Sequence, residues 1–320
     1  MAELAIVIGN GFDLDLGLPS KYSDFIKSRE WENVVKRIAP FLNSDSYRRH
    51  SLVAQLQLAS QKSLWCDVEE EIHKFVLSHS ENSNQEIGEI KNEFDLIKSA
   101  LTDYLKRVSK ELKHKADKTK LAYILLNSTQ VIPMSKVFIY FNYTTPELFL
   151  EVPTYHEPGK ALFTYVHGSL RDNDIVLGCD LQEGEKVNRQ LSFMYKYNML
   201  NRANHVARNI LEAKEIIFFG HSVNEMDFGY FREFFKVTSA SPQPTRHLTF
   251  ITLNEKSERD IKDNIRNQGI SVTDLYNNLE SFTFIHTEKL YKQDAKEVQK
   301  WDDMFKRVST KTTRGVKRRN

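Results

Sequence analysis

The sequence predicts an α/β protein: a doubly wound, mostly parallel sheet with a helical insertion or cap beside it. Two observations predict this fold. Over most of the chain, short runs of apolar, β-branched and aromatic residues alternate with helical patterns, and several runs are apolar at consecutive positions. Strands buried on both faces have that pattern, which is typical of parallel sheets covered by helices. Residues 31–130, by contrast, contain almost no residue that breaks a helix.

Seven segments are expected to be strands, and helical patterns separate the later ones. The expected strands cover residues 4–9, 136–143, 161–168, 174–178, 215–220, 247–254 and 281–287. The expected helices cover residues 186–213, 224–237 and 256–267. Alternation of strand and helix is the repeating unit of a doubly wound fold. Residues 1–30 and 131–295 are therefore expected to form one Rossmann-like, nucleotide-binding core.

Residues 31–130 are expected to form the helical cap. The chain has 12 glycines and 8 prolines in 320 residues, about half the usual share of ~12%. Gly88 is the only glycine of this segment, and no proline occurs in 41–132, so little interrupts a helix. Apolar residues recur every three or four positions from Ile90 to Leu112. This spacing predicts one buried face on a long helix.

Composition excludes several classes of protein. With 40% hydrophobic residues, the chain can bury a sizeable core and is not disordered as a whole. It has no run of 18 apolar residues, and its start enters the first predicted strand without a basic leader. We therefore expect a cytoplasmic protein without a membrane span or a secretory signal. Two cysteines, Cys66 and Cys179, are too few for a disulfide framework or a thiolate zinc site, so no structural zinc is expected.

The last residues differ from the rest in charge. Residues 306–320 hold seven lysines and arginines and no acid, which leaves a small net negative charge on the remainder of the chain. This balance argues against a broad nucleic-acid surface on the folded part. The segment 306–320 is expected to be a solvated basic tail.

Small and polar residues follow the predicted strands. They lie at the strand ends, which is where a doubly wound sheet binds its ligands. The carboxyl ends of parallel strands lie along one edge, and ligands bind in the crevice there. The groups expected at this edge are Gly9-Asn10-Gly11-Phe12-Asp13, Asn142-Tyr143-Thr144, His167-Gly168-Ser169, Gly220-His221-Ser222 and Asn254-Glu255. Polar groups clustered at a sheet edge cost desolvation free energy unless water or a ligand satisfies them. The pattern therefore indicates a ligand site.

The glycine turn after the first strand has two interpretations. Gly9 and Gly11 let the backbone turn sharply and approach a phosphate that side chains would otherwise block. A tight turn without any ligand explains the same two glycines equally well. Leu14 stands where the dinucleotide fingerprint has its third glycine, so the usual dehydrogenase motif is not present.

Four motifs resemble those of the bacteriophage abortive-infection AbiH-type family. They are IGNGFDLDLGLP at residues 8–19, FNYT at 141–144, HG at 167–168 and FGHSVNEMD at 219–227. The segment WCDVEEE at 65–71 also resembles the W-x-D-x-E of the family. The resemblance implies a role in phage defence, with an unidentified phage or host trigger as a partner.

A more distant resemblance is to sirtuin-like NAD-binding proteins. The positions that match are Gly9, Gly11, Gly17 and Pro19, then Asn142, then His167-Gly168, then Gly220-His221-Ser222, and last Asn254. This resemblance implies a sirtuin-like sheet with NAD as substrate or ligand. The two CxxC pairs of the zinc ribbon in true sirtuins cannot form here, so deacetylation of proteins is not expected.

The resemblance implies hydrolysis of the N-glycosidic bond of NAD to nicotinamide and ADP-ribose, with water as the acceptor. Asn142 would hold the attacking water or the carboxamide, and His167 would accept a proton, which suits a reference pKa near ~6.5. The glycine turn would receive the phosphates, Ser222 would bond the diphosphate or a ribose, and Asn254 would contact the adenosine ribose. The nucleotide-binding residues that it implies are Gly9, Asn10, Gly11, Phe12, Asp13, Gly220, His221, Ser222, Asp227 and Asn254.

Acidic residues near these motifs have more than one interpretation. Asp13 replaces a serine of the sirtuin pattern and brings a negative charge close to a pyrophosphate, unless it turns away or binds a cation. It could instead cap the next helix. Asp227 either opens a helix or orients His221 or a bound water. Asp67 and Glu69 could face the cleft only if their helix covers it.

Two other functions stay open beside the hydrolase. The cleft could sense a nucleotide without turnover and pass its occupancy to a partner through the cap or the tail, and a homo-oligomer is compatible with this. A metal-dependent nuclease would use the carboxylates of Asp13, Asp15 and Asp227 to hold magnesium. The hydrolase interpretation requires that the glycine turn, Asn142 and His167 open onto one pocket.

Overall fold

A six-stranded parallel sheet lies at the centre of the computed structural model, which describes residues 2–310 apart from 63–67, 80–81, 114–116, 131, 133, 146–160, 182–183, 187 and 197–202. The strand order is β3-β2-β1-β4-β5-β6, and all five pairings are parallel. The strands are β1 (Leu4–Ile8), β2 (Lys136–Tyr140), β3 (Ala161–Tyr165), β4 (Glu215–Phe219), β5 (Gln243–Thr252) and β6 (Leu279–His286). The predicted doubly wound α/β fold is confirmed.

The consecutive apolar residues of the strands face two separate cores. In β1, Leu4, Ile6 and Ile8 belong to one buried cluster, and Ala5 and Val7 belong to the other. Because side chains alternate across a strand, a strand covered on both sides has no polar position in its middle. β2 and β4, which flank β1, are likewise buried at every position.

Helices cover both faces of the sheet. Buried residues of α9 (Ala203–Glu212), α11 (Arg232–Ala240), α12 (Glu255–Asn267) and α13 (Val272–Asn278) join the cluster of Ala5 and Val7. Buried residues of α1 (Asn10–Asp15), α8 (Leu121–Gln130), α14 (Thr287–Tyr291) and α15 (Ala295–Thr310) join the other cluster. In the part of the chain that the structure describes, every helix is too short or too polar to cross a bilayer.

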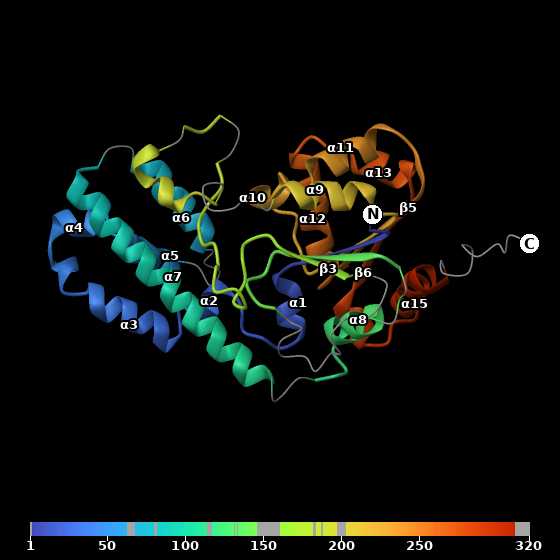
Figure 1. Cartoon of the computed structure of the whole chain (residues 1–320), viewed down its shortest axis with the longest axis horizontal. Helices are drawn as coiled ribbons and strands as arrows, with labels where there is room; N and C mark the ends of the chain where they lie inside the picture. The colour runs from blue at the N-terminus through green and yellow to red at the C-terminus, as the bar shows by residue number, and fades with distance from the viewer. Residues whose placement is uncertain are drawn as a thin grey trace, which may run out of the picture.

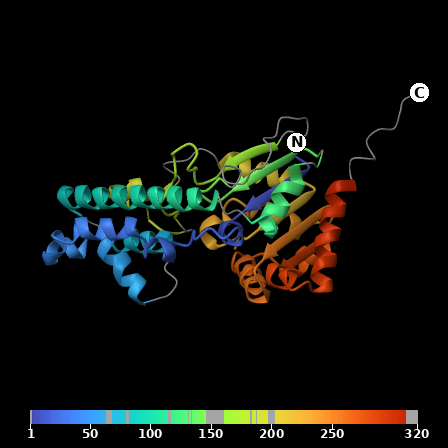
Figure 2. The same ribbon diagram turned by 90° about the horizontal axis from the view of Figure 1, so that it is seen from below.

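The expected helical cap extends to one side of the sheet. Its elements are α2 (Tyr22–Phe25), α3 (Arg29–Ile38), a 3-10 turn η1 (Phe41–Asn43), α4 (Asp45–Arg49), α5 (Leu52–Lys62), α6 (Val68–Ser78) and α7 (Asn84–Lys113). Figure 1 shows α3 to α7 on the left of the sheet, and Figure 2 shows the same separation from below. The long helix predicted from Ile90 to Leu112 is confirmed as α7, of 30 residues. The residues of α8 were expected to belong to the cap. They instead pack on α1 and join the buried cluster on one face of the sheet.

The structure corrects three local expectations. Residues 174–178 are not a strand: Gly168, at φ +74, turns the chain back after β3, and the amide of Val176 donates to the carbonyl of His167 at 2.8 Å. The expected helix over 186–213 is two separate elements, the 3-10 helix η3 (Arg189–Met194) and α9, on either side of the undescribed residues 197–202. The predicted tail begins too early, because α15 continues to Thr310.

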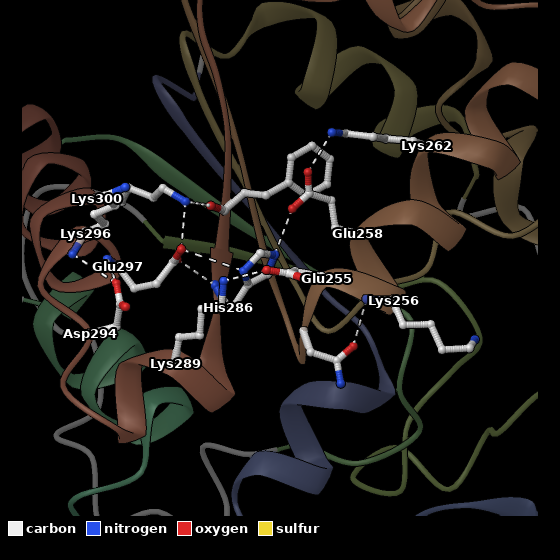
Figure 3. Close-up of polar contacts among 12 residues, drawn as sticks. Glu255, Lys256, Glu258, Lys262, His286, Lys289, Asp294, Lys296, Glu297 and Lys300 are labelled. Carbon is white, nitrogen blue, oxygen red and sulfur yellow. Dashed lines mark hydrogen bonds and ion pairs between the residues drawn. The ribbon is translucent and has the colours of Figure 1, made fainter.

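A buried polar cluster fastens α15 to the last strand (Figure 3). The Nε2 atom of His286 lies 2.8 Å from Glu258, and its backbone amide donates to Glu297 at 2.9 Å. Lys300 donates to Glu297 at 2.8 Å, and Lys262 donates to Glu258 at 2.6 Å. His286 and Glu297 are only 4% and 3% exposed. A polar group buried in this way lowers the stability of the fold if it loses its hydrogen-bond partner.

We expect Glu297→Ala to lower the free energy of unfolding by about 2 kcal/mol, because it leaves the buried amide of His286 without its acceptor. Asp302→Ala on the same helix is the matched control, because Asp302 is exposed and its loss should cost less than about 0.5 kcal/mol. Urea denaturation of both variants measures the difference. Equal effects would show that the cluster contributes little to stability.

Candidate active site

A cavity of about 220 Å³ opens at the carboxyl ends of β1, β2, β3 and β4. The strand order reverses between β1 and β4, which is where doubly wound sheets bind their ligands. The lining residues are Gly9, Asn10, Asp13, Ser20, Lys21, Tyr22, Ser23, Glu69, Leu101, Leu105, Phe141, Asn142, Tyr143, Thr144, His167, Gly220, His221, Ser222, Asn224 and Asp227. The structure thus brings Gly9, Asn142 and His167, from three strand ends, to one cavity.

The glycine turn is explained by close packing of two backbone segments. A Cβ atom on Gly9 would lie 2.6 Å from the carbonyl oxygen of Gly220, and one on Gly11 would lie 2.6 Å from the Cα atom of Gly220. The amides of Gly9 and Gly11 donate to Phe219 and Gly220 at 3.0 and 2.9 Å, and the amide of Phe12 donates to Gly9 at 2.9 Å. The backbone from Gly9 to Gly11 was expected to receive the phosphates, and the structure corrects that expectation for the amides of Gly9 and Gly11, which already have acceptors.

Asp13 lies in the cavity wall and is 1% exposed. The Thr144 hydroxyl donates to its Oδ2 atom, and its Oδ1 atom is buried and has no hydrogen-bond partner among the residues that the structure describes. Burial raises the pKa of Asp13 to about 7, and the neighbouring Thr144 and Asn142 side chains oppose that rise. Asp13 therefore does not cap α1; its side chain binds the segment after β2.

The raised pKa makes Asp13 destabilising at neutral pH. Between about pH 4 and pH 7, Asp13 keeps its proton in the folded state, whereas in the unfolded state, with an ordinary aspartate pKa, it has lost it. The free energy of unfolding therefore falls as the pH rises through that window, and it levels off above it. We expect the free energy of unfolding of Asp13→Asn, measured relative to wild type, to be higher at pH 8 than at pH 5 by on the order of 2 kcal/mol. Urea denaturation at both pH values measures this gain. Asp103→Asn, at an exposed position of α7, should show no such change, and a pH-independent effect of Asp13→Asn would contradict the assignment.

Asp227 joins two histidines from different strand ends. Its Oδ1 atom lies 3.1 Å from His167 Nε2, and its Oδ2 atom lies 3.5 Å from His221 Nε2. It lies in the short helix α10 (Glu225–Phe228), where the side chain of Asn224 accepts a hydrogen bond from its amide. Burial alone would raise the pKa of Asp227, but the hydrogen bond from His167 and the nearby charges hold it below the ordinary value. Asp227 is therefore an anion. It lies in the first turn of α10 and also beside His221, so the geometry is compatible with both interpretations of this residue.

The hydrogen bonds fix where the protons of the two histidines lie. The Nδ1 atom of His221 accepts from the Val223 amide at 2.9 Å, so its proton is on Nε2, toward Asp227. Burial lowers the pKa of His221 to about 4, and the ring is neutral near pH 7. His167 donates from Nε2 to the anion, which leaves Nδ1 as the nitrogen with a free lone pair. That Nδ1 atom is buried and has no hydrogen-bond partner among the described residues.

Asn142 is held by the glycine turn. Its Nδ2 atom donates to the carbonyl oxygen of Gly9 at 3.2 Å, and the residue is 7% exposed. Because the NH2 group is fixed in this way, the amide oxygen is left as the atom that can accept a hydrogen bond from a bound group.

The helical cap contributes Glu69 of α6 to the cavity wall. Glu69 accepts from Tyr143 at 2.7 Å and from Lys196 at 2.7 Å. Burial alone would lower the pKa of Lys196, but the charges of Glu69, Asp227 and Asp180 raise it above the ordinary value. Lys196, 1% exposed, was missed from the sequence because it lies 127 positions from Glu69, within a segment expected to be helical. Trp65 and Asp67 lie outside the described residues.

Other predicted residues lie away from the cavity. Asn254 caps α12 by accepting from the amides of Lys256 and Ser257, and it donates to Glu288 at 3.2 Å. It is not among the lining residues, so its predicted contact with a ribose has no support from this geometry. Asp15 accepts from the Ala122 amide and from Tyr291, so the three carboxylates of the nuclease hypothesis do not meet. Phe12 is buried in the core against Phe219.

Comparison with protein-family models identifies the chain. The model of bacteriophage abortive infection AbiH matches residues 5–246, well over half of the chain. The chain belongs to the AbiH family. Its role is accordingly in abortive infection, a defence against phage.

The AbiH match covers every residue that lines the cavity, from Gly9 to Asp227. The helices from α12 onward lie beyond the match. No curated protein and no solved structure matches this AbiH-family chain.

Proposed function

We propose that this AbiH-family protein acts in phage defence by hydrolysing the N-glycosidic bond of NAD to nicotinamide and ADP-ribose. The observation that carries the proposal is the meeting of Asn142 and His167 in one cavity, with the His167 ring oriented by an anionic Asp227. An acid is not needed for this reaction, because the leaving nicotinamide is already cationic in the substrate. The site has to position water and stabilise an oxocarbenium-like ribose.

His167 acts as the general base of this reaction. Its Nε2–H group donates to Asp227 at 3.1 Å, so Nδ1 is the nitrogen that takes a proton from water or from a ribose hydroxyl. Asp227 stabilises the imidazolium that results, and His221 supports the charge of Asp227 from the other side. The same logic of base and orienting carboxylate operates in the Ser-His-Asp triad.

Asn142 positions the nucleophile or the carboxamide. Its amide oxygen accepts a hydrogen bond, because its NH2 group is engaged by Gly9. The anionic groups of the wall favour positive charge on the ribose as the glycosidic bond breaks. A cavity of about 220 Å³ is smaller than the ~300–1,000 Å³ of sites that enclose drug-sized ligands, so it encloses the nicotinamide ribose and not the whole dinucleotide.

Incubation of the purified chain with NAD tests the proposal, with nicotinamide measured by chromatography. We expect release by the wild-type chain and a rate about 100-fold lower in Asn142→Ala, because one positioning group is removed. Asn267→Ala is the matched control, because Asn267 is exposed on α12. No release by the wild-type chain, or equal rates in wild type and Asn142→Ala, would refute the hydrolase.

A sensor of nucleotides is the second candidate, and the contact of the cap with the cavity favours it. Glu69 of α6 is part of the cavity wall and is bonded to Tyr143 in the segment after β2, so a ligand in the cavity touches both the cap and the sheet edge. Calorimetry with NAD and with ADP-ribose separates the two candidates. A sensor binds the dinucleotide without forming nicotinamide.

A further inference from the structure

The unpaired oxygen of Asp13 is the feature of the cavity that the reaction outlined above does not use. In the described part of the chain, the buried Oδ1 atom has no hydrogen-bond partner, while Oδ2 is bonded to Thr144. A buried acceptor with no partner lowers stability, and such groups in native proteins call for an explanation. Three aromatic residues, Tyr22, Phe141 and Tyr143, line the same cavity.

We propose that Asp13 recognises the positive charge of the ligand, so that the cavity selects a flat, cationic N-ribosyl ring such as nicotinamide in its oxidised, pyridinium form. This inference deepens the proposed function and rests on it for the choice of ring. A carboxylate together with aromatic faces is the arrangement by which proteins bind quaternary nitrogen, because the faces of aromatic rings attract cations.

A phosphate fits this end of the site poorly. The amides of Gly9, Gly11 and Phe12, which form phosphate sites in other glycine turns, donate to carbonyl groups of the protein. A phosphate beside Asp13 would add like-charge repulsion to the cost of its burial. The glycine turn therefore belongs to the wall around the ring, and the diphosphate of a dinucleotide lies elsewhere.

Binding of a cation to Asp13 has a proton signature. A nearby positive charge favours the carboxylate over the carboxylic acid, so a cationic ring releases a proton from Asp13, whereas an anionic ligand takes one up. The other charged or titratable residues that line the cavity are Lys21, Tyr22, Glu69, Tyr143, His167, His221 and Asp227. They are the same in wild type and in Asp13→Asn, so comparison of the two isolates Asp13.

Isothermal titration calorimetry of the full chain with 1-methylnicotinamide is the test. This probe is a pyridinium carboxamide without a ribose, so it cannot be hydrolysed and its binding does not depend on turnover. Titrations at pH 7 in two buffers of different ionisation enthalpy count the protons that are released. Uncharged nicotinamide, of nearly the same shape, is the matched ligand.

We expect release of about half a proton on binding at pH 7, and none with Asp13→Asn. Since the ionised fraction of a group that titrates near pH 7 rises about tenfold from pH 6 to pH 8, the dissociation constant of 1-methylnicotinamide should fall about tenfold over that range. Nicotinamide should show neither effect. The comparison of the two rings in the wild-type chain needs no variant, so it stands even if Asp13→Asn fails to fold.

Proton uptake, no proton exchange, equal affinity for the charged and uncharged rings, or no binding of 1-methylnicotinamide would each overturn the inference. These outcomes are distinct from failure of the proposed function. A chain that binds the cationic ring with proton release and never cleaves NAD is a sensor of the charged ring. A chain that cleaves NAD and does not distinguish the two rings is a hydrolase in which Asp13 has another role.

Discussion

The Asp227→Asn variant is expected to release nicotinamide from NAD about 10³–10⁴-fold more slowly than the wild-type chain. The substitution keeps the shape of the side chain and removes its charge, so His167 loses the anion that fixes its proton on Nε2. In the wrong tautomer, Nδ1 carries the proton and cannot act as a base; the same change in a Ser-His-Asp protease costs about 10⁴ in kcat. Single-turnover rates of nicotinamide release measure the effect.

His167→Ala should lose about as much activity as Asp227→Asn, and the double variant little more than either. Residues that act as one unit are strongly non-additive. Glu225→Gln is the matched control, because it removes an exposed carboxylate from the same helix, α10. Full activity in Asp227→Asn, or losses that multiply in the double variant, would show that the two side chains do not act together.

The Gly11→Ala variant is expected to lower the free energy of unfolding by about 3 kcal/mol. The new methyl group would lie 2.6 Å from the Cα atom of Gly220, where the neighbour is backbone and cannot move aside by a change of rotamer. Gly220 itself has a φ of +63, which an L-residue rarely adopts. Its amide and its carbonyl oxygen are both hydrogen-bonded, so a shift of this segment away from the new methyl group would break these bonds. Urea denaturation measures the loss.

Gly88→Ala is the matched control for the glycine substitution. Gly88 lies on the exposed face of α7, with no atom within 4 Å of an added Cβ. Alanine is the better residue in a helix, so this variant should be more stable than wild type by about 0.5–1 kcal/mol. Gly11→Ala with the stability of wild type would mean that the two turns do not pack as closely as described here.

Strands and strand ends could be predicted from the sequence because their signals are local. A run such as residues 4–9 is apolar at every position only if both faces of the strand are covered, and that requirement is met in β1. The polar ends of β1, β2, β3 and β4 meet in one cavity because parallel strands end at the same edge. Segment 174–178 shows the limit of such signals, since an apolar run packs equally well as a buried loop.

The family motifs also lie within local segments, and the match to AbiH over residues 5–246 agrees with them. Motifs predict which residues gather, but not how each one is used. Gly9 and Gly11 suggested a phosphate cradle, whereas their amides serve the packing of two strand ends. Asn254, at the end of β5, is used as a helix cap.

The sequence by itself determined the doubly wound sheet, the helical cap and the set of strand ends that meet at the cavity. Only the tertiary structure decided the charge states and the partners within the site: Asp227 between two histidines, Lys196 with Glu69, and Asp13 buried with one oxygen that no described residue pairs. The physical reason is that periodicity and turn chemistry act between near neighbours in the chain. Desolvation and pairing of charges depend on groups that are far apart in sequence and meet only after the sheet and the cap have packed together.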